Sequence, residues 1–173
     1  MTSAANRLRR LSGNKTVVSG FWRNLLTVIV ALFKRDAAIL QTGCFCFFWV
    51  TPFDVGVRTL KSDKYLQLVE AAQLDFGVRS GLLRRVRRAL CAMVNIEQQI
   101  QFNQPIELFN RVCVQTNIVY ADAKFVHFLH TFYAKGQQCA RVAVKAKFKK
   151  GSITQSALQL TGFASTNKPQ AAM

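Results

Sequence analysis

The sequence predicts a single α+β domain in which an antiparallel sheet wraps around one central helix. An apolar, strand-like stretch comes first, an amphipathic helical stretch follows at residues 62–76, and four alternating segments then continue to Lys150. No long crossover helix separates these later segments, which argues against a parallel sheet. Such a sheet needs a cover for one face, and residues 62–76 form the long amphipathic helix available for it. Half of the 173 residues are hydrophobic, which suffices for one core.

Four regions are expected along the chain. Residues 1–19 are basic and have no regular apolar period, so they predict a flexible leader. Residues 20–40 predict an extra N-terminal helix that is both apolar and basic. Residues 41–163 form the α+β domain, and the small, polar residues 164–173 predict a flexible tail.

The apolar stretch at residues 21–35 begins with Phe21 and ends with Arg35. Its uninterrupted part, residues 25–33, is far shorter than the roughly 20 residues that span a bilayer. No small-residue cleavage site follows, so a secretory signal is not expected and the protein is predicted to be cytoplasmic. The stretch is interpreted either as a helix packed on the domain or as a helix that rests on the inner face of a membrane.

The first strand is predicted within residues 43–51, where CFCFFWV is aromatic-rich and apolar throughout. This composition is typical of a strand buried on both faces. Ser62 is then expected to cap the central helix, with Asp63 in its first turn. Gly77 and Gly81 are expected to end that helix.

One stripe of the central helix is predicted to face the core, because its apolar residues recur at helical spacing. They are Tyr65, Leu68, Val69, Ala72 and Phe76. The segments that follow alternate with a period of two, and turns are expected at Asp122 and at Gly136. In the last strand the basic side chains share one face opposite the apolar ones, which predicts a solvated basic face. They are Arg141, Lys145 and Lys147.

The charge balance predicts anionic partners. There are 24 basic and 8 acidic residues, giving +16, and the densest cluster is Arg84, Arg85, Arg87 and Arg88. Membrane phospholipids, nucleic acid and the phosphates of coenzyme A all fit this charge. Nucleic-acid binding is not expected, because no recognised motif is present and most aromatic residues of the late strands alternate into the core.

The five cysteines show neither metal-ligand spacing nor a disulfide framework, so reduced thiols and no metal site are expected. Cys113 and Cys139 lie in alternating strands and are interpreted as small core residues. His127 and His130 are three apart in a strand and should point to opposite faces, so they cannot share a metal within it.

Two segments carry a family resemblance. FWVTPFDVGVRTLKSDKYLQLVEAAQLDF, residues 48–76, and KFVHFLHTFYAKGQQCARVAVKAKFKKG, residues 124–151, together resemble the 4-hydroxybenzoyl-CoA thioesterase-like family. The shared features are an aspartate after the first strand, a Tyr near the helix start with an acid five residues on, and two long closing strands. The resemblance implies a hotdog fold, an acyl-CoA thioesterase activity and a homodimer.

The resemblance also implies a set of site residues. Asp54 matches the aspartate that acts as nucleophile or general base, and the helix start at residues 62–65 matches the oxyanion site. Glu70 is a second candidate acid, and Thr59, Ser62 and Tyr65 are expected at the substrate. The sequence lacks the His and paired Asn that commonly follow the aspartate. Asp54 is therefore alternatively a loop acid paired with a nearby cation, and Glu70 alternatively a solvated helix acid.

Cations near an acyl tunnel would bind the phosphates of coenzyme A. The candidates are Arg84, Arg85, Lys145 and Lys147, which alternatively form a solvated or lipid-facing surface. Coenzyme A enters only as part of the substrate, with acyl-carrier protein as the other carrier, and no separate cofactor is expected. The alternative function is a non-catalytic hotdog domain that binds acyl chains or a partner at a membrane surface.

Overall fold

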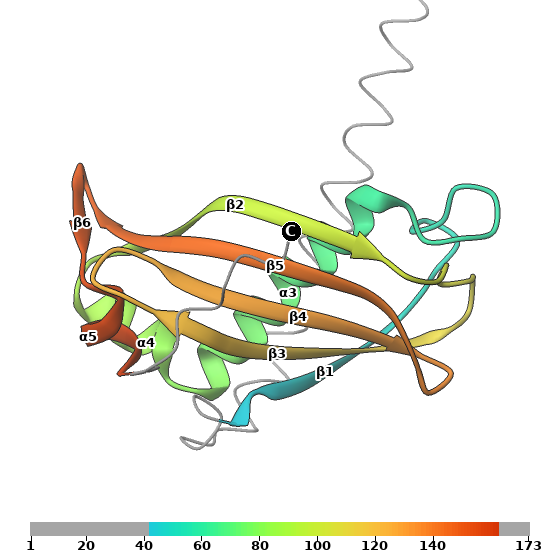
Figure 1. Ribbon diagram of the computed structural model, residues 1–173, viewed down its shortest axis with the longest axis horizontal. Coiled ribbons are helices and arrows are strands. Elements are labelled where there is room, and N and C mark those ends of the chain that lie inside the picture. The colour runs from blue at the N-terminus through green and yellow to red at the C-terminus, as the bar shows by residue number, and fades with distance from the viewer. Residues whose placement is uncertain (1–41, 163–173) are drawn as a thin grey trace, which may run out of the picture.

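The computed structural model describes residues 42–162 (Figure 1). In chain order the elements are β1 (Cys44–Trp49), α3 (Ser62–Arg79), α4 (Leu82–Arg88), β2 (Ala92–Phe102), β3 (Arg111–Ala121), β4 (Val126–Ala134), β5 (Gln137–Lys150), β6 (Ile153–Gln155) and α5 (Ala157–Thr161). The predicted order of a strand, a helix and four further strands is confirmed. The short elements α4, β6 and α5 were not predicted.

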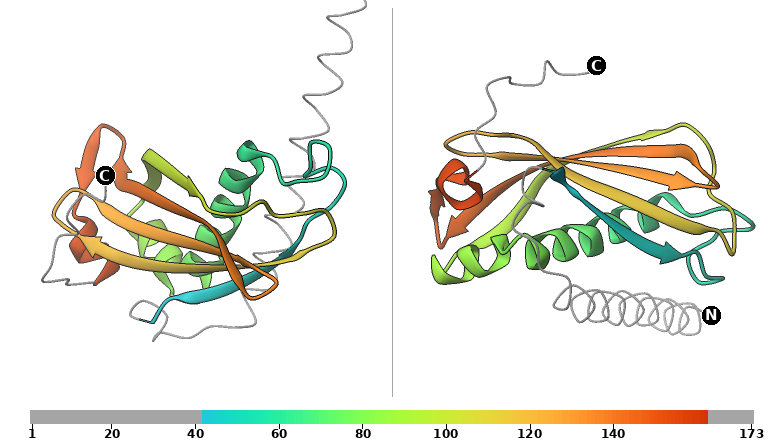
Figure 2. Two further views of the ribbon diagram at one scale, coloured as in Figure 1. Left: turned by 45° about the vertical axis from the view of Figure 1, so that its right-hand side comes forward. Right: turned by 90° about the horizontal axis from the view of Figure 1, so that it is seen from below.

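The sheet has the strand order β1-β3-β4-β5-β2, and β6 pairs with β5. Every pairing is antiparallel. Helix α3 crosses one face of the curved sheet, and no element of the described chain covers the other face (Figure 2). The predicted sheet wrapped around one helix is therefore confirmed.

The core lies between α3 and the face of the sheet that curves around it. All five residues of the predicted helical stripe are buried. Aromatic rings connect the two layers: Phe76 meets Phe128 edge-on with centroids 5.9 Å apart, and Tyr65 lies 5.2 Å from Phe132. Contacts of this kind, together with the buried area itself, hold the helix against the sheet.

The predicted ends of α3 need correction. The helix begins at Ser62, but the preceding residue, Lys61, occupies the capping position, and no side chain of the described residues caps it. At the other end Gly77 lies inside the helix, which continues to Arg79. Gly81 adopts φ +74°, a left-handed conformation that glycine takes without strain, and it precedes α4.

Strand β1 was predicted to be buried on both faces, and this is wrong. Cys44 and Phe48 face α3 and are buried, whereas Phe45, Phe47 and Trp49 are 51%, 54% and 66% exposed. β1 is an edge strand that pairs with β3, and α3 covers only one of its faces. We call the exposed trio Phe45, Phe47 and Trp49 the β1 aromatic face.

The predicted leader (residues 1–19), N-terminal helix (residues 20–40) and tail (residues 164–173) lie outside the described residues. Within residues 42–162, no helix has the length and apolar character needed to cross a membrane.

Candidate active site

Asp54 is a buried carboxylate in the loop between β1 and α3. Only 2% of the residue is exposed. Its Oδ2 accepts hydrogen bonds from the Thr51 amide at 3.0 Å and from the Thr51 hydroxyl at 2.6 Å, and the Asp54 amide donates back to the Thr51 carbonyl. This is a local turn in which a short polar side chain satisfies the backbone. The carboxylate is thereby held in one orientation.

Backbone contacts tie the same loop to the start of α3. Lys61 donates its amide to the Asp54 carbonyl at 3.1 Å, and Val55 forms a β-bridge with Leu60. A second bridge joins Thr59 to Glu107 in the β2–β3 connection. The loop is thus closed on itself and anchored to a neighbouring segment, with the Thr59 side chain exposed.

The start of α3 presents backbone N–H groups without a capping side chain from the described residues. The first N–H groups of a helix lie at the positive end of its dipole, so this position suits negative charge, although the Lys64 amide already donates to the Lys61 carbonyl at 3.0 Å. Ser62, the first helical residue, is exposed. Tyr65 is buried between Phe102 and Phe132, and burial is the main cause that raises its pKa to about 12, although a backbone hydrogen bond with Ile106 opposes this.

Lys64 is a residue of this region that the sequence analysis missed. Its side chain is fully buried and Nζ donates to Gln67 Oε1 at 3.0 Å. Lys64 and Asp75 both lie on the buried side of α3. A helical-wheel reading could have found them, because both positions are in phase with Leu68. A buried lysine side chain thus lies in the first turn of α3.

The predicted site residues fall into two groups. Asp54, Thr59, Ser62 and Tyr65 lie at or just before the N-terminal end of α3. Arg84 and Arg85 belong to α4, which follows the other end of α3 (Figure 1), and Lys145 and Lys147 lie in the second half of β5, which leads to β6 and α5. Within one chain these cations do not surround Asp54. Glu70 is exposed midway along α3.

Contacts of the second group are local. Arg85 donates to the carbonyls of Leu160 and Thr161, which ties α4 to α5. Lys145 lies 3.8 Å from a carboxylate oxygen of Glu97 and 4.6 Å from the centre of the Phe125 ring. Lys145 and Lys147 share the uncovered face of the sheet, as predicted.

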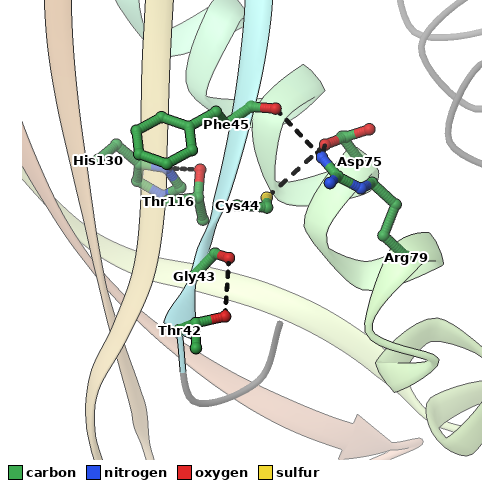
Figure 3. A network of polar contacts seen from close by, with 8 residues as sticks. All are labelled: Thr42, Gly43, Cys44, Phe45, Asp75, Arg79, Thr116 and His130. Atoms are coloured by element: carbon green, nitrogen blue, oxygen red, sulfur yellow. Dashed lines mark hydrogen bonds and ion pairs between the residues drawn. The ribbon is translucent and has the colours of Figure 1, made fainter. Parts of the chain in front are cut away.

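A buried polar network lies between β1 and the second half of α3 (Figure 3). The Cys44 thiol donates to Asp75 Oδ2 at 3.6 Å, and Arg79 Nη1 donates to the same oxygen and to the Phe45 carbonyl, both at 3.1 Å. Burial and then the Asp75 charge raise the pKa of the Cys44 thiol, and likewise raise that of Cys46 to about 12. Both thiols are protonated at neutral pH, so this network is structural rather than nucleophilic.

The two histidines point to opposite faces, as predicted. His130 is buried, its Nδ1 is 3.0 Å from the Thr116 hydroxyl, and burial lowers its pKa to about 3. His127 packs against Tyr120 on the other face. Cys139 is buried as predicted, but Cys113 is only half-buried because its side chain points to the uncovered face.

Comparison with known proteins identifies the family. Residues 58–157 match the Thioesterase-like superfamily. Protein THEM6 of Drosophila melanogaster is 22% identical over 132 residues, which are 75% of this chain and 68% of that protein.

Two solved structures illustrate the likeness of fold. A gentisyl-coenzyme A thioesterase superposes with a TM-score of 0.63 at 16% identity, covering 69% of this chain and 100% of that one. A Staphylococcus aureus protein in complex with CoA gives 0.62 at 15% identity, covering 68% and 78%. The family match spans more than half of the chain, which therefore belongs to the thioesterase-like superfamily of hotdog proteins.

Proposed function

We propose that the protein hydrolyses an acyl-CoA or acyl-carrier-protein thioester, with Asp54 as nucleophile or general base. The observation that carries this proposal is the buried Asp54 carboxylate, held by Thr51 and tied through Lys61 to the start of α3, which no described side chain caps. Membership of a thioesterase-like superfamily supports the reaction class. The earlier resemblance to the 4-hydroxybenzoyl-CoA group within it supports the role of Asp54.

The proposed chemistry needs few groups. As a base, Asp54 takes a proton from water while the water oxygen bonds to the thioester carbon; as a nucleophile, it bonds to that carbon itself and water later cleaves the anhydride. The carbonyl oxygen gains negative charge, which the N–H groups of residues 62–65 stabilise from their fixed positions. The C–S bond breaks as this oxyanion collapses. In the base route, Asp54 returns its proton to the departing thiolate. In the nucleophile route, the thiolate leaves as the anhydride forms and takes a proton from solvent; water then cleaves the anhydride to the carboxylic acid and Asp54, which returns a proton to solvent.

The edge of β2 that no described strand pairs with supports the proposal of a homodimer. β2 pairs with β5 on one side, and the exposed apolar residues Val94, Ile96 and Phe102 lie along it. If two β2 strands pair antiparallel, their ends reverse, so the α4 end of one subunit lies toward the Asp54 end of the other. In this arrangement Arg84 and Arg85 of the second copy supply the phosphate-binding cations, and Glu70 faces a subunit interface.

The direct test is thiol release from a panel of short-, medium- and long-chain acyl-CoA substrates. Asp54→Asn should lower kcat about 10²–10⁴-fold, the usual contribution of a positioned acid or base, while acyl-CoA binding is retained. Asp63→Asn, an exposed acid in the first turn of α3, is the matched control and should keep its rate. Equal rates for Asp54→Asn and wild type would remove Asp54 from the mechanism.

The alternative, a non-catalytic domain at a membrane, is favoured by one observation, the β1 aromatic face. Trp49 and Phe47 are exposed next to Arg111, whose guanidinium lies 4.3 Å above the Phe47 ring. Aromatic rings beside cations suit the headgroup layer of an anionic membrane. The apolar and basic residues 21–35 come shortly before β1 in the chain and would add to the same contact.

Sedimentation with vesicles tests this second function. Full-length protein should bind vesicles containing phosphatidylserine and bind phosphatidylcholine vesicles less, because the attraction is partly electrostatic. Trp49→Ser combined with Phe47→Ser should weaken binding, while Ile153→Ser, an exposed residue on β6 outside the β1 aromatic face and the β2 edge, should not. If the double variant binds vesicles as well as wild type does, the β1 aromatic face is not the membrane-binding surface. If folded wild type releases no thiol from any acyl-CoA or acyl-carrier protein, the non-catalytic membrane-binding function becomes the better supported of the two.

A further inference from the structure

A hollow of about 140 Å³ lies between the second half of α3, helix α4 and the start of β2. Most of its lining is apolar: Leu74, Leu82, Leu83, Val86, Met93 and Phe128. Protein interiors leave few voids larger than a water molecule, so a hollow of this size is available space. An apolar cavity of about 150 Å³ accepts a benzene molecule, so this one fits a single ring or a short alkyl chain.

One polar group of the lining has no hydrogen-bond partner in the described part of the chain. Gln73 is 5% exposed, and its Oε1 accepts a hydrogen bond from Asn95 Nδ2 at 3.0 Å. Its Nε2, however, is buried and has no hydrogen-bond partner among residues 42–162, and the same is true of Asn95 Oδ1 in this pair of amides. Burying an unpaired amide donor is unfavourable, so a ligand atom that accepts a hydrogen bond from it would be stabilised.

An exposed arginine lines the hollow and supplies positive charge where it meets solvent. Arg87 is part of the lining and is exposed, and Arg84 and Arg88 are exposed on the same short helix. Among residues 42–162, no acidic side chain forms an ion pair with any of these three arginines. An anionic group at the mouth would therefore meet uncompensated positive charge.

We propose that this hollow, the α3–α4 pocket, binds a small apolar carboxylate, with its ring or alkyl chain inside and its acid group at Arg87. The Gln73 amide donates to one oxygen of the same acid group. The pocket is distinct from the Asp54 site within one chain, because Gln73 lies eleven residues beyond the start of α3, which is about 16 Å along a helix. The proposal does not depend on thioester hydrolysis.

Cys91 offers a direct readout in the unaltered protein. Its side chain is half-buried and lines the pocket, whereas Cys113 is half-buried on the uncovered face of the sheet. Iodoacetamide labelling of full-length protein, followed by peptide mass spectrometry, gives the rate at each thiol. Benzoate should slow labelling of Cys91 and leave that of Cys113 unchanged. Acetate, which lacks the ring, and benzyl alcohol, which lacks the charge, should protect less at the same concentration.

Matched variants then test the charge and the space. Arg87→Gln should weaken benzoate binding about tenfold to a hundredfold, the usual value of a hydrogen bond to a charged group, and leave benzyl alcohol unaffected. Arg84→Gln is the control, because Arg84 is equally exposed on α4 but is not part of the lining. Leu83→Trp should abolish protection by filling the pocket, provided that its circular dichroism spectrum matches wild type.

The proposal is overturned if millimolar benzoate leaves Cys91 labelling unchanged in wild type. It is also overturned if Arg84→Gln and Arg87→Gln weaken benzoate equally, because the effect would then be general charge attraction. Both results are independent of kcat, so a rate unaffected by Asp54→Asn would leave the α3–α4 pocket standing.

Discussion

Both faces of strand β1 carry apolar side chains, but one face is buried against α3 and the other is exposed. Toward α3 the strand places Cys44, Cys46 and Phe48, and its buried polar links connect it to the helix. Toward solvent it places the β1 aromatic face, which no described element covers. The bulkier side chains are mostly on the exposed face. Size and hydrophobicity therefore do not decide which face of an edge strand supports the fold, and the exposed rings are available for another role.

The largest expected effect separates the two faces directly. Phe48→Ala should lower the free energy of unfolding by about 3–5 kcal/mol, because it opens a cavity under the sheet. Phe47→Ala, its neighbour on the exposed face, should cost at most about 1 kcal/mol through the lost contact with Arg111. Urea denaturation measures both. Similar losses of stability for the two variants would show that the exposed face of β1 supports the fold as much as the buried face does.

The next effect concerns the link between β1 and α3. Arg79 donates to Asp75 and to the Phe45 carbonyl, so it joins the strand backbone to the helix. Arg79→Met keeps most of the side-chain length but removes the charged donor, and it should cost about 1.5–3 kcal/mol. Arg88→Met, an exposed arginine on α4, should change stability by less than about 0.5 kcal/mol. An equal effect of both changes would show that the link is dispensable.

The stability of the fold should also depend on pH through His130, which lies on the buried face of β4. His130 has a pKa of about 3 in the fold against 6.5 when exposed, so between these values the unfolded chain binds a proton that the folded chain does not. Stability should therefore fall as the pH falls below 6.5, by about 1.4 kcal/mol per unit and about 2 kcal/mol at pH 5.

Urea denaturation at pH 7 and pH 5 checks this. His130→Gln should remove this part of the pH dependence, whereas His127→Gln, on the uncovered face, should leave it in place. If the variant and wild type lose equal stability between the two pH values, His130 is not the group responsible.

The smallest stability effect is expected on the exposed face. Trp49→Ser should change the free energy of unfolding by less than about 0.5 kcal/mol, because the side chain is mostly in solvent. A clear loss of stability would mean that the β1 aromatic face supports the fold, and would weaken its assignment to a membrane.

The fold could largely be predicted from periodicity. The stripe on α3 and the alternation of β3, β4 and β5 each have one apolar side, so the sequence shows which side is inside. β1 has apolar residues on both sides, so its pattern cannot reveal an exposed face. Helix α4 is only seven residues long, which is too short for a clear helical period. Its four arginines predicted only a charged surface, so the burial of Leu82 and Val86 was not predicted.

The candidate site was only partly predictable. Asp54 and the helix start are neighbours in the chain, so their proximity could be foreseen. The cations of α4 and β5 could not be placed, because their distance from Asp54 depends on the length of α3 and the course of the sheet. Gln73 and the α3–α4 pocket were missed because an unpaired amide and a void arise from tertiary packing and leave no periodic signal.

The pairing of β1 with β3 also affects how the chain is made. Cys44 pairs with Thr116, some 70 residues later in the sequence. At about 5–20 residues per second, a ribosome needs several seconds to supply that partner strand. During this time an aromatic strand with unpaired backbone groups leaves the ribosome, which is a risk for association between nascent chains. The β1 aromatic face is thus exposed before folding is complete as well as after it, and β1 should dock late because its contacts are far apart in sequence.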